Sequence, residues 1–252
     1  FFNGAFPSLA KRLGIVYTPI EVVDFILNSV DSVLRQEFSE SLGSTGVHIL
    51  DPFAGTGTFI ARLIQSGLID RGQLEKKYRE EIHANELVLL AYYIAAINIE
   101  AAFHGQAGGG YIPFEGMCLT DTFQMYERDD LINELLVANS QRRTRQKQLD
   151  IRVIVGNPPY SSGDKDDTNA KNIDYPSLDR RIADTYVAQS SNSMGKSKIY
   201  DSYIRALRWA SDKVAERGVV CFVSGSGFLD KPANDGLRRA LANEFSKIYV
   251  LN

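Results

Sequence analysis

Four consecutive residues, Asn157-Pro158-Pro159-Tyr160, combine an amide side chain, a rigid turn and an aromatic ring. They follow the apolar run 151–155, which predicts a buried strand that the prolines end, because proline lacks an N–H and fixes φ. The Asn157 amide oxygen and the Pro158 carbonyl are neighbouring hydrogen-bond acceptors that suit a planar –NH2 group, and Tyr160 can stack on the ring that carries it. A plain strand-ending Pro-Pro turn is the simpler interpretation.

A second group of residues is the turn Asp51-Pro52-Phe53-Ala54-Gly55-Thr56-Gly57, which follows the apolar run 47–50 and precedes a predicted helix over 58–65. Gly55 and Gly57 allow tight backbone geometry and the close approach of a ligand. The spacing is neither the G-x-G-x-x-G dinucleotide motif nor a P-loop. Asp51 would repel a phosphate and favour a cation, or a ligand with hydroxyl and amine groups. An ordinary turn whose glycines serve only packing is the alternative.

Two more acidic residues end predicted strands, Glu86 after 82–86 and Asp121 after 116–121. At the carboxyl end of a parallel strand, a carboxylate such as Glu86 can accept hydrogen bonds from ribose hydroxyls. Asp121 can likewise accept one from an adenine amino group. An acidic side chain near a helix N-terminus is also favoured by the helix dipole, so position alone leaves both interpretations open.

The elements that must position these residues alternate between strands and helices. The hydrophobic pattern predicts strands at 47–51, 82–86, 116–121, 153–156, 219–224 and 247–251, and helices at 19–38, 58–65, 87–103, 200–216 and 233–245. Such alternation predicts an α/β fold with a doubly wound, mainly parallel sheet. With 252 residues, of which 44% are hydrophobic, one domain over 1–252 is the simplest division.

Composition excludes several classes of protein. No stretch approaches the roughly 18 apolar residues of a membrane helix. The two cysteines, Cys118 and Cys221, form no C-x-x-C pair, which fits a reducing cytoplasm and argues against a zinc site or a disulfide framework. The net charge of −3 does not favour nucleic acid, although the balance turns positive over residues 151–252.

Together, the turn that begins at Asp51 and the later Asn157–Tyr160 motif resemble the S-adenosylmethionine-dependent DNA N6-adenine methyltransferases. The run 14–19, Gly-Ile-Val-Tyr-Thr-Pro, resembles the extra cofactor motif of that family, and its place ahead of both motifs matches the γ order. Residues 175–182 and 200–210 resemble the single-chain type ISP restriction–modification enzymes, which join nuclease, helicase, methyltransferase and target-recognition parts.

The resemblance implies a class I (Rossmann-like) methyltransferase sheet, S-adenosyl-L-methionine as cofactor, no metal, and double-stranded DNA as partner. The methyl group would pass directly to N6 of an adenine flipped out of the duplex. The catalytic residues would be Asn157, Pro158, Pro159 and Tyr160. The cofactor would be bound by Tyr17, Thr18, Pro19, Asp51, Phe53, Ala54, Gly55, Gly57, Glu86, Asp121 and Asn157.

The resemblance also bears on how the chain is organised. It implies a cytoplasmic fragment of a longer chain with nuclease, helicase and target-recognition domains, whose sheet continues past Asn252. Residues 1–45 would form an N-terminal helical part that carries the cofactor motif. The polar segment 161–198 is expected to be a loop that closes as a lid when DNA binds.

Three other functions remain open. The chain could be a protein-glutamine N5 methyltransferase, since those enzymes share the Asn-Pro-Pro-Tyr turn, or an RNA base methyltransferase, which would use similar chemistry. It could also be a module that binds S-adenosylmethionine but transfers no methyl group. Cytosine-C5 methylation is disfavoured, because neither Cys118 nor Cys221 lies in the Pro-Cys turn that such an enzyme requires.

Overall fold

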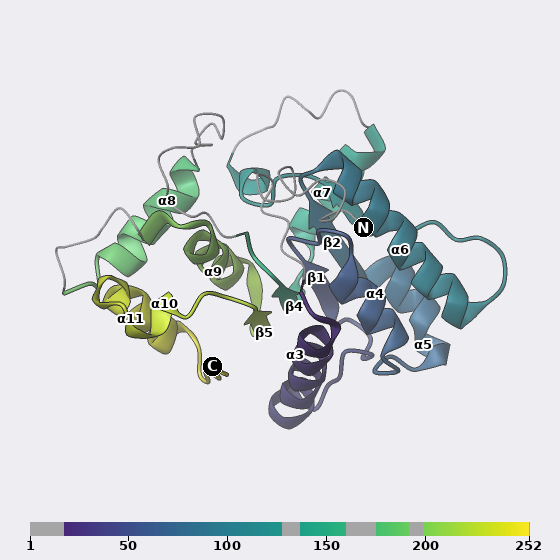
Figure 1. Ribbon diagram of the computed structural model, residues 1–252, viewed down its shortest axis with the longest axis horizontal. Coiled ribbons are helices and arrows are strands. Elements are labelled where there is room, and N and C mark those ends of the chain that lie inside the picture. The colour runs from purple at the N-terminus through teal and green to yellow at the C-terminus, as the bar shows by residue number, and fades with distance from the viewer. Residues whose placement is uncertain (1–17, 128–136, 160–174, 192–198, 252) are drawn as a thin grey trace. The chain divides into compact units, whose positions relative to one another are not determined.

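The structure is a computed structural model that describes residues 18–127, 137–159, 175–191 and 199–251 (Figure 1). The chain forms two compact units. Unit 1 comprises residues 1–157 and 213–222, and unit 2 comprises residues 158–212 and 223–252. Tyr17 and Tyr160 lie outside the described residues.

Unit 1 is built on a five-stranded parallel sheet with the order β3-β2-β1-β4-β5. The strands are β1 (His48–Asp51), β2 (Ile82–Glu86), β3 (Met117–Leu119), β4 (Ile151–Gly156) and β5 (Val214–Phe222). From β1 to β3 the chain adds strands in one direction, and it then returns to place β4 on the other side of β1. The strand order therefore reverses between β1 and β4, and the predicted α/β fold with a mainly parallel sheet is confirmed.

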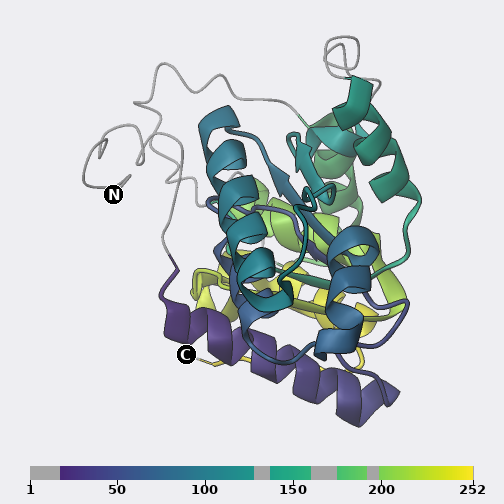
Figure 2. The ribbon, with the colours of Figure 1, turned by 90° about the vertical axis from the view of Figure 1, so that its right-hand side faces the viewer.

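Helices flank this sheet in unit 1 (Figures 1 and 2). They are α3 (Ile20–Val33), which continues as a π-helical turn (Leu34–Phe38), α4 (Thr58–Gln65), α5 (Arg71–Lys76) with its π-helical turn (Lys77–Glu81), α6 (Leu89–Ala107), a 3-10 turn (Gln124–Tyr126) and α7 (Val137–Gln148). The apolar spacing that predicted the first helix is its buried face, since Val23, Ile26, Leu27 and Val30 are all buried. A bidentate ion pair between Arg62 and Asp24 joins α4 to α3.

The last strand of the sheet begins earlier than the sequence predicted. Helix α9 (Ser202–Lys213) ends at Lys213, and β5 starts at once, so the predicted helix over 200–216 is too long. Val214 pairs with Ile151 and Val219 with Val153, which leaves four residues of β5 in an irregularity opposite one residue of β4. A Cβ on Gly218 would lie 3.0 Å from the carbonyl oxygen of Arg152 and closer still to β5 itself, so this irregularity requires glycine.

The predicted strand over 247–251 is wrong for the described residues. This segment has no regular secondary structure, and the side chains of Ile248, Tyr249, Val250 and Leu251 are at least half exposed. The segment is apolar, as a strand would be, but no strand in the described part of the chain pairs with it.

Unit 2 is helical in its described part. Its elements are α8 (Pro176–Ile182), a π-helical turn (Ala183–Val187), α9, α10 (Gly227–Asp230), a 3-10 turn (Pro232–Asn234) and α11 (Asp235–Glu244). Its core consists of Ile182, Tyr186, Ile199, Tyr203, Ile204, Leu237, Ala240 and Leu241. The expectation of a loop over 161–198 is therefore wrong for 176–187, where Ile182 and Tyr186 are fully buried. Residues 161–174 and 192–198 lie outside the described residues, so the lid stays a prediction there.

A buried arginine holds unit 2 together. The guanidinium of Arg208 donates to Glu244 and to Asp212, both at 2.7 Å, and lies over the ring of Tyr186. Only 2% of its side chain is exposed, so both the charge and the alkyl chain are inside the unit. Removal of one partner from such a cluster leaves the other charges poorly solvated.

We therefore expect Arg208→Ala to lower the free energy of unfolding of unit 2 by about 2–4 kcal/mol. Trp209, the single tryptophan of the chain, lies beside it in the same helix, so urea unfolding followed by tryptophan fluorescence reports on this unit. Arg180→Ala is the control, because the Arg180 side chain is 83% exposed and should change the midpoint little. Equal midpoints for the two variants would contradict the expectation.

The described residues contain neither a membrane-spanning helix nor a metal-binding cluster. No helix there is long and apolar enough to cross a membrane. Within the same ranges, His, Cys, Asp and Glu side chains form no group of three or more that could hold a metal ion.

Candidate functional site

The predicted site residues of unit 1 gather at one edge of its sheet. Asp51, Glu86 and Gly156 are the last residues of β1, β2 and β4, and Asn157 follows directly. The carboxyl ends of parallel strands meet at the same edge, and here that edge includes the point between β1 and β4 where the strand order reverses. In open α/β sheets this is where ligands bind.

Asp51 is a buried carboxylate with one unused oxygen. Its Oδ1 accepts a hydrogen bond from the Phe53 backbone N–H at 3.1 Å, whereas Oδ2 is buried without a hydrogen-bond partner among the described residues. Burial raises the pKa of Asp51 to about 7; the Phe53 N–H lowers it and the charge of Glu86 raises it. A buried oxygen of this kind fits a ligand that brings a hydrogen-bond donor or a positive charge.

Gly156 is a site residue that the sequence reasoning missed. A Cβ at this position would lie 2.7 Å from Asp51 Oδ1, so any larger residue would push the carboxylate away. The only signal in the sequence was a glycine at the end of an apolar run, which can mark a close approach of two chain segments.

The two glycines of the turn after β1 have different roles. Gly57, with φ +80°, is the N-cap of α4, and a Cβ on it would lie 3.2 Å from the Ala95 Cα of α6. Gly57 therefore serves helix packing. Gly55 has φ +55°, and apart from the glycine and its two chain neighbours no atom of the described residues lies within 4 Å of the place where a Cβ would be. At Gly55 the turn thus leaves its backbone open to a ligand.

Glu86 holds this turn from the next strand. Its Oε2 accepts a hydrogen bond from the Gly55 N–H at 2.8 Å, and its Oε1 accepts one from the Val88 N–H at 2.7 Å. Burial raises the pKa of Glu86, and the backbone N–H groups oppose that shift. Each carboxylate oxygen can accept a second hydrogen bond, so Glu86 can bind hydroxyl groups in addition to holding the turn.

Asp121 lies just before a short 3-10 turn (Gln124–Tyr126). Its Oδ1 accepts hydrogen bonds from the backbone N–H groups of Phe123, at 2.9 Å, and Gln124, at 3.4 Å. Asp121 thus lies near a helix N-terminus, the alternative that the sequence left open for this residue, and a role in ligand binding stays a prediction.

Asn157 presents a buried amide oxygen. Its Nδ2 donates a hydrogen bond to the Thr18 hydroxyl at 3.0 Å, and its Oδ1 is buried with no hydrogen-bond partner in the described part of the chain. Thr18 is buried, and Pro19, the N-cap of α3, is exposed. Pro158 and Pro159 belong to unit 2.

Aromatic rings lie beside the turn after β1. Phe53 makes an edge-on contact with Phe123, with ring centroids 5.4 Å apart, and a tilted contact with Phe222 at 6.2 Å. Ala54, the next residue of the turn, donates its N–H to the backbone carbonyl of Asn85 at 2.9 Å. Phe123 and Phe222 were not predicted as site residues. The position of Phe53 in the sequence does not reveal which other aromatic rings the fold places against it.

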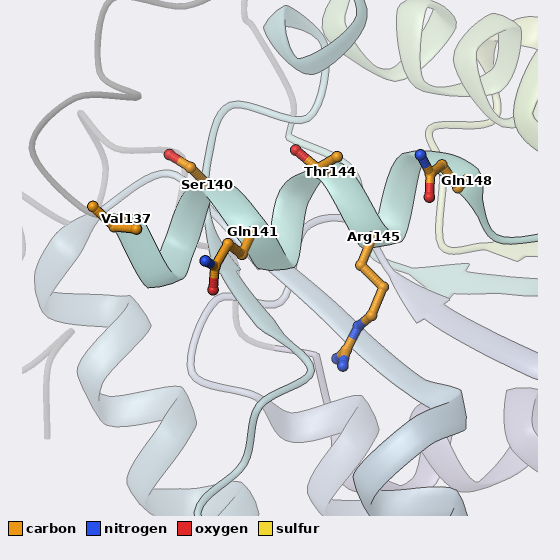
Figure 3. A pocket seen from close by; sticks show the side chains of 6 residues that line it. All are labelled: Val137, Ser140, Gln141, Thr144, Arg145 and Gln148. Carbon is orange, nitrogen blue, oxygen red and sulfur yellow. The ribbon is translucent and has the colours of Figure 1, made fainter.

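A groove runs along α7. It is lined by Val137, Ser140, Gln141, Thr144, Arg145 and Gln148 (Figure 3). None of them is a predicted site residue. The basic run 142–147 lies within α7, where Arg143 and Gln146 are buried.

The strand order and the groups at its carboxyl edge define a doubly wound α/β domain whose candidate site lies at the reversal point. More narrowly, the chain belongs to the N-6 DNA methylase family, whose model matches residues 2–196. No curated protein matches the sequence.

Three solved structures of similar proteins are much longer than this chain. The first is a nuclease-deletion mutant of the type ISP restriction–modification enzyme LlaGI in complex with a DNA substrate mimic; it is 47% identical with a TM-score of 0.88, and the match covers 97% of this chain and 20% of that one. The DrdV–DNA complex is 43% identical, with a TM-score of 0.89 and coverage of 97% and 24%. The ATP-dependent type ISP enzyme LlaBIII bound to DNA is 47% identical, with a TM-score of 0.87 and coverage of 96% and 16%. The resemblance to type ISP enzymes is thus confirmed, and the chain spans about a fifth of their length.

Proposed function

We propose that this chain transfers a methyl group from S-adenosylmethionine to N6 of adenine in double-stranded DNA, as the modification part of a restriction–modification enzyme. The observation that carries the proposal is the Asn157 Oδ1, a buried acceptor without a partner among the described residues at the carboxyl end of β4. Membership of the N-6 DNA methylase family supports the same reaction.

A buried amide acceptor suits the chemistry of an adenine amine. The N6 lone pair is delocalised into the ring, so the amine is a poor nucleophile. Asn157 Oδ1 and the Pro158 carbonyl would accept hydrogen bonds from N6–H and draw the nitrogen towards a tetrahedral, more nucleophilic geometry. Acceptors already aimed at the site where positive charge develops stabilise the transition state. Tyr160 would stack on the adenine, which must leave the duplex to be reached.

The residues at the strand ends fit S-adenosylmethionine, which supplies a methyl group activated by a positively charged sulfur when bound. Asp51 would pair with the amine of the methionine part through its unused Oδ2, and Thr18, Pro19 and Tyr17 would line the same end. Glu86 would accept hydrogen bonds from the ribose hydroxyls, and Asp121 one from the adenine amino group. The open backbone at Gly55 and the side chains of Phe53 and Ala54 would complete the contact, with Gly57 shaping the turn.

The partners follow from the similar proteins. LlaGI is in complex with a DNA substrate mimic, DrdV and LlaBIII are bound to DNA, and LlaGI and LlaBIII are restriction–modification enzymes. By analogy, we propose that this chain modifies double-stranded DNA alongside nuclease, helicase and target-recognition domains of a longer protein in the cytoplasm.

A calorimetric titration with S-adenosylmethionine tests the cofactor assignment first, and transfer of a radiolabelled methyl group tests the reaction. We expect label to appear in adenine-containing duplex DNA, and not in RNA competitors or in a glutamine-containing peptide. A folded protein that binds no S-adenosylmethionine, or label that appears in RNA or peptide instead, would contradict the proposal.

A further inference from the structure

Three buried polar side chains lie behind the turn after β1, and none was among the predicted site residues. They are Asn85 of β2, Thr122 in the loop after β3, and Gln146 of α7, with 0%, 3% and 2% of their surface exposed. Hydrogen bonds join them in a row. Thr122 Oγ1 donates to the Pro52 carbonyl at 2.6 Å, Asn85 Nδ2 donates to Thr122 Oγ1 at 3.3 Å, and Gln146 Nε2 donates to Asn85 Oδ1 at 2.9 Å.

The Pro52 carbonyl, at one end of this row, determines which group donates and which accepts in every bond. A carbonyl oxygen can only accept, so the Thr122 hydroxyl must donate its single proton to Pro52. The hydroxyl oxygen can then only accept from Asn85, which turns the Nδ2 of Asn85 towards it. Asn85 Oδ1 thus faces α7 and requires a donor, which Gln146 supplies. A flipped Asn85 or Gln146 amide would place like groups together, so the row has a single arrangement that keeps all its bonds.

Asn85 holds the turn at two positions, Pro52 and Ala54. The Asn85 side chain reaches Pro52 through Thr122, and the Asn85 backbone carbonyl accepts directly from the Ala54 N–H at 2.9 Å. Thr122 also stands between Asp121 and Phe123, whose ring packs on Phe53. One hydroxyl therefore ties the turn after β1 to the loop after β3.

We propose that Thr122 is a positioning residue for the cofactor. Its hydroxyl, which donates to the Pro52 carbonyl and accepts from Asn85, sets the spacing between the turn that carries Asp51 and Gly55 and the loop that carries Asp121. The proposal rests on the proposed function for the identity of the ligand. Thr122 acts through the Pro52 carbonyl and need not touch the ligand itself.

The test compares Thr122→Val with Thr122→Ser. Valine keeps the shape and leaves both the Pro52 carbonyl and Asn85 Nδ2 without their partner, whereas serine keeps the hydroxyl. In Thr122→Val we expect the Kd for S-adenosylmethionine to rise by about 10-fold or more, and the Ala54 and Gly55 amides of the ligand-free protein to exchange with solvent about 10-fold faster. Thr122→Ser should stay within about 3-fold of wild type in both measurements.

A matched control is Thr120→Val, because Thr120 is also buried in this loop but bonds to the Asp121 carbonyl instead of Pro52. Its Kd should stay within about 3-fold of wild type. Gln146→Met, which removes the last donor and keeps a similar shape, provides a second variant should Thr122→Val fail to fold. It should weaken binding and speed Ala54 exchange in the same direction, by a smaller factor.

Lower stability of Thr122→Val with an unchanged Kd and unchanged Ala54 and Gly55 exchange would overturn the proposal, since Thr122 would then be a core residue only. Failure of the wild-type chain to bind S-adenosylmethionine would count against the proposed function instead. In that case the exchange rates of Ala54 and Gly55 in the two Thr122 variants would still decide whether the hydroxyl positions the turn.

Discussion

Replacement of Asn157 by alanine should reduce methyl transfer to DNA by about 10³-fold or more, while the Kd for S-adenosylmethionine changes by less than about 5-fold. Its Oδ1 is a buried acceptor with no partner among the described residues, so a donor from the substrate would find it already in place. Loss of one such preorganised group removes stabilisation that appears only as charge develops on the attacking nitrogen. Radiolabel transfer at saturating cofactor and DNA, beside a calorimetric titration, separates the two effects.

Asn157→Asp is the informative companion to this variant. The carboxylate keeps an acceptor oxygen and the shape of the side chain, and it can still bond to Thr18 by accepting from the hydroxyl. We expect it to retain at least about 10-fold more activity than the alanine variant. A fully active Asn157→Ala would refute the catalytic assignment, and loss of cofactor binding in that variant would show that Asn157 acts in binding.

Asp51→Asn should make the ligand-free protein more stable at pH 8. Burial raises the pKa of the folded Asp51 carboxyl to about 7 from its usual 3.8, so the folded state holds this proton more tightly than the unfolded state. The resulting stability is present below pH 4 and is lost as the pH rises towards 7. An uncharged amide avoids that loss, and we expect a gain of about 1–3 kcal/mol in the free energy of unfolding at pH 8, with little gain at pH 4.

The same substitution should weaken S-adenosylmethionine binding by at least about 10-fold, because it removes the negative charge that would face the ligand amine. Urea unfolding followed by circular dichroism at the two pH values, and calorimetry at pH 8, provide the measurements. Asp230→Asn, at an exposed position of unit 2, serves as the control and should change neither quantity. If Asp51→Asn lowered the free energy of unfolding at pH 8, the buried charge of Asp51 would not be destabilising. If the variant bound S-adenosylmethionine like wild type, Asp51 would not bind the ligand amine.

Sequence patterns predicted the elements that carry strong periodicity. The bounds of β2 and α4 match their predictions, because Ile82–Glu86 and Thr58–Gln65 are flanked by clear changes of pattern. The sequence did not predict that helix α7 packs against the sheet. Its buried residues are Asn139, Arg143 and Gln146, and a polar buried face gives no hydrophobic pattern. The helix of unit 2 over 176–182 was missed for a related reason, since it contributes only Leu178 and Ile182 to the buried side.

Some residues of the candidate site could be predicted from the sequence, and others could not. Acidic and glycine residues at strand ends could be predicted, because their type and position carry chemistry and they match a family motif. Thr122 and Asn85 could not, since a threonine or an asparagine in sequence is most often a surface residue. Their role depends on which atoms the fold brings together, and Gly156 is informative only once Asp51 is known to lie against it.

The division of unit 1 into two stretches of chain has a consequence for its synthesis. Residues 158–212 leave the ribosome after β4 and before β5, so the sheet cannot be completed until residue 222 has been added. At ordinary translation rates this interval lasts roughly 3–13 s. Throughout it, one edge of β4 is unpaired, although Val153 and Val155 are fully buried in the finished sheet. We therefore expect nascent chains that stop near residue 212 to be bound by chaperones, or to associate with one another through the unpaired edge of β4.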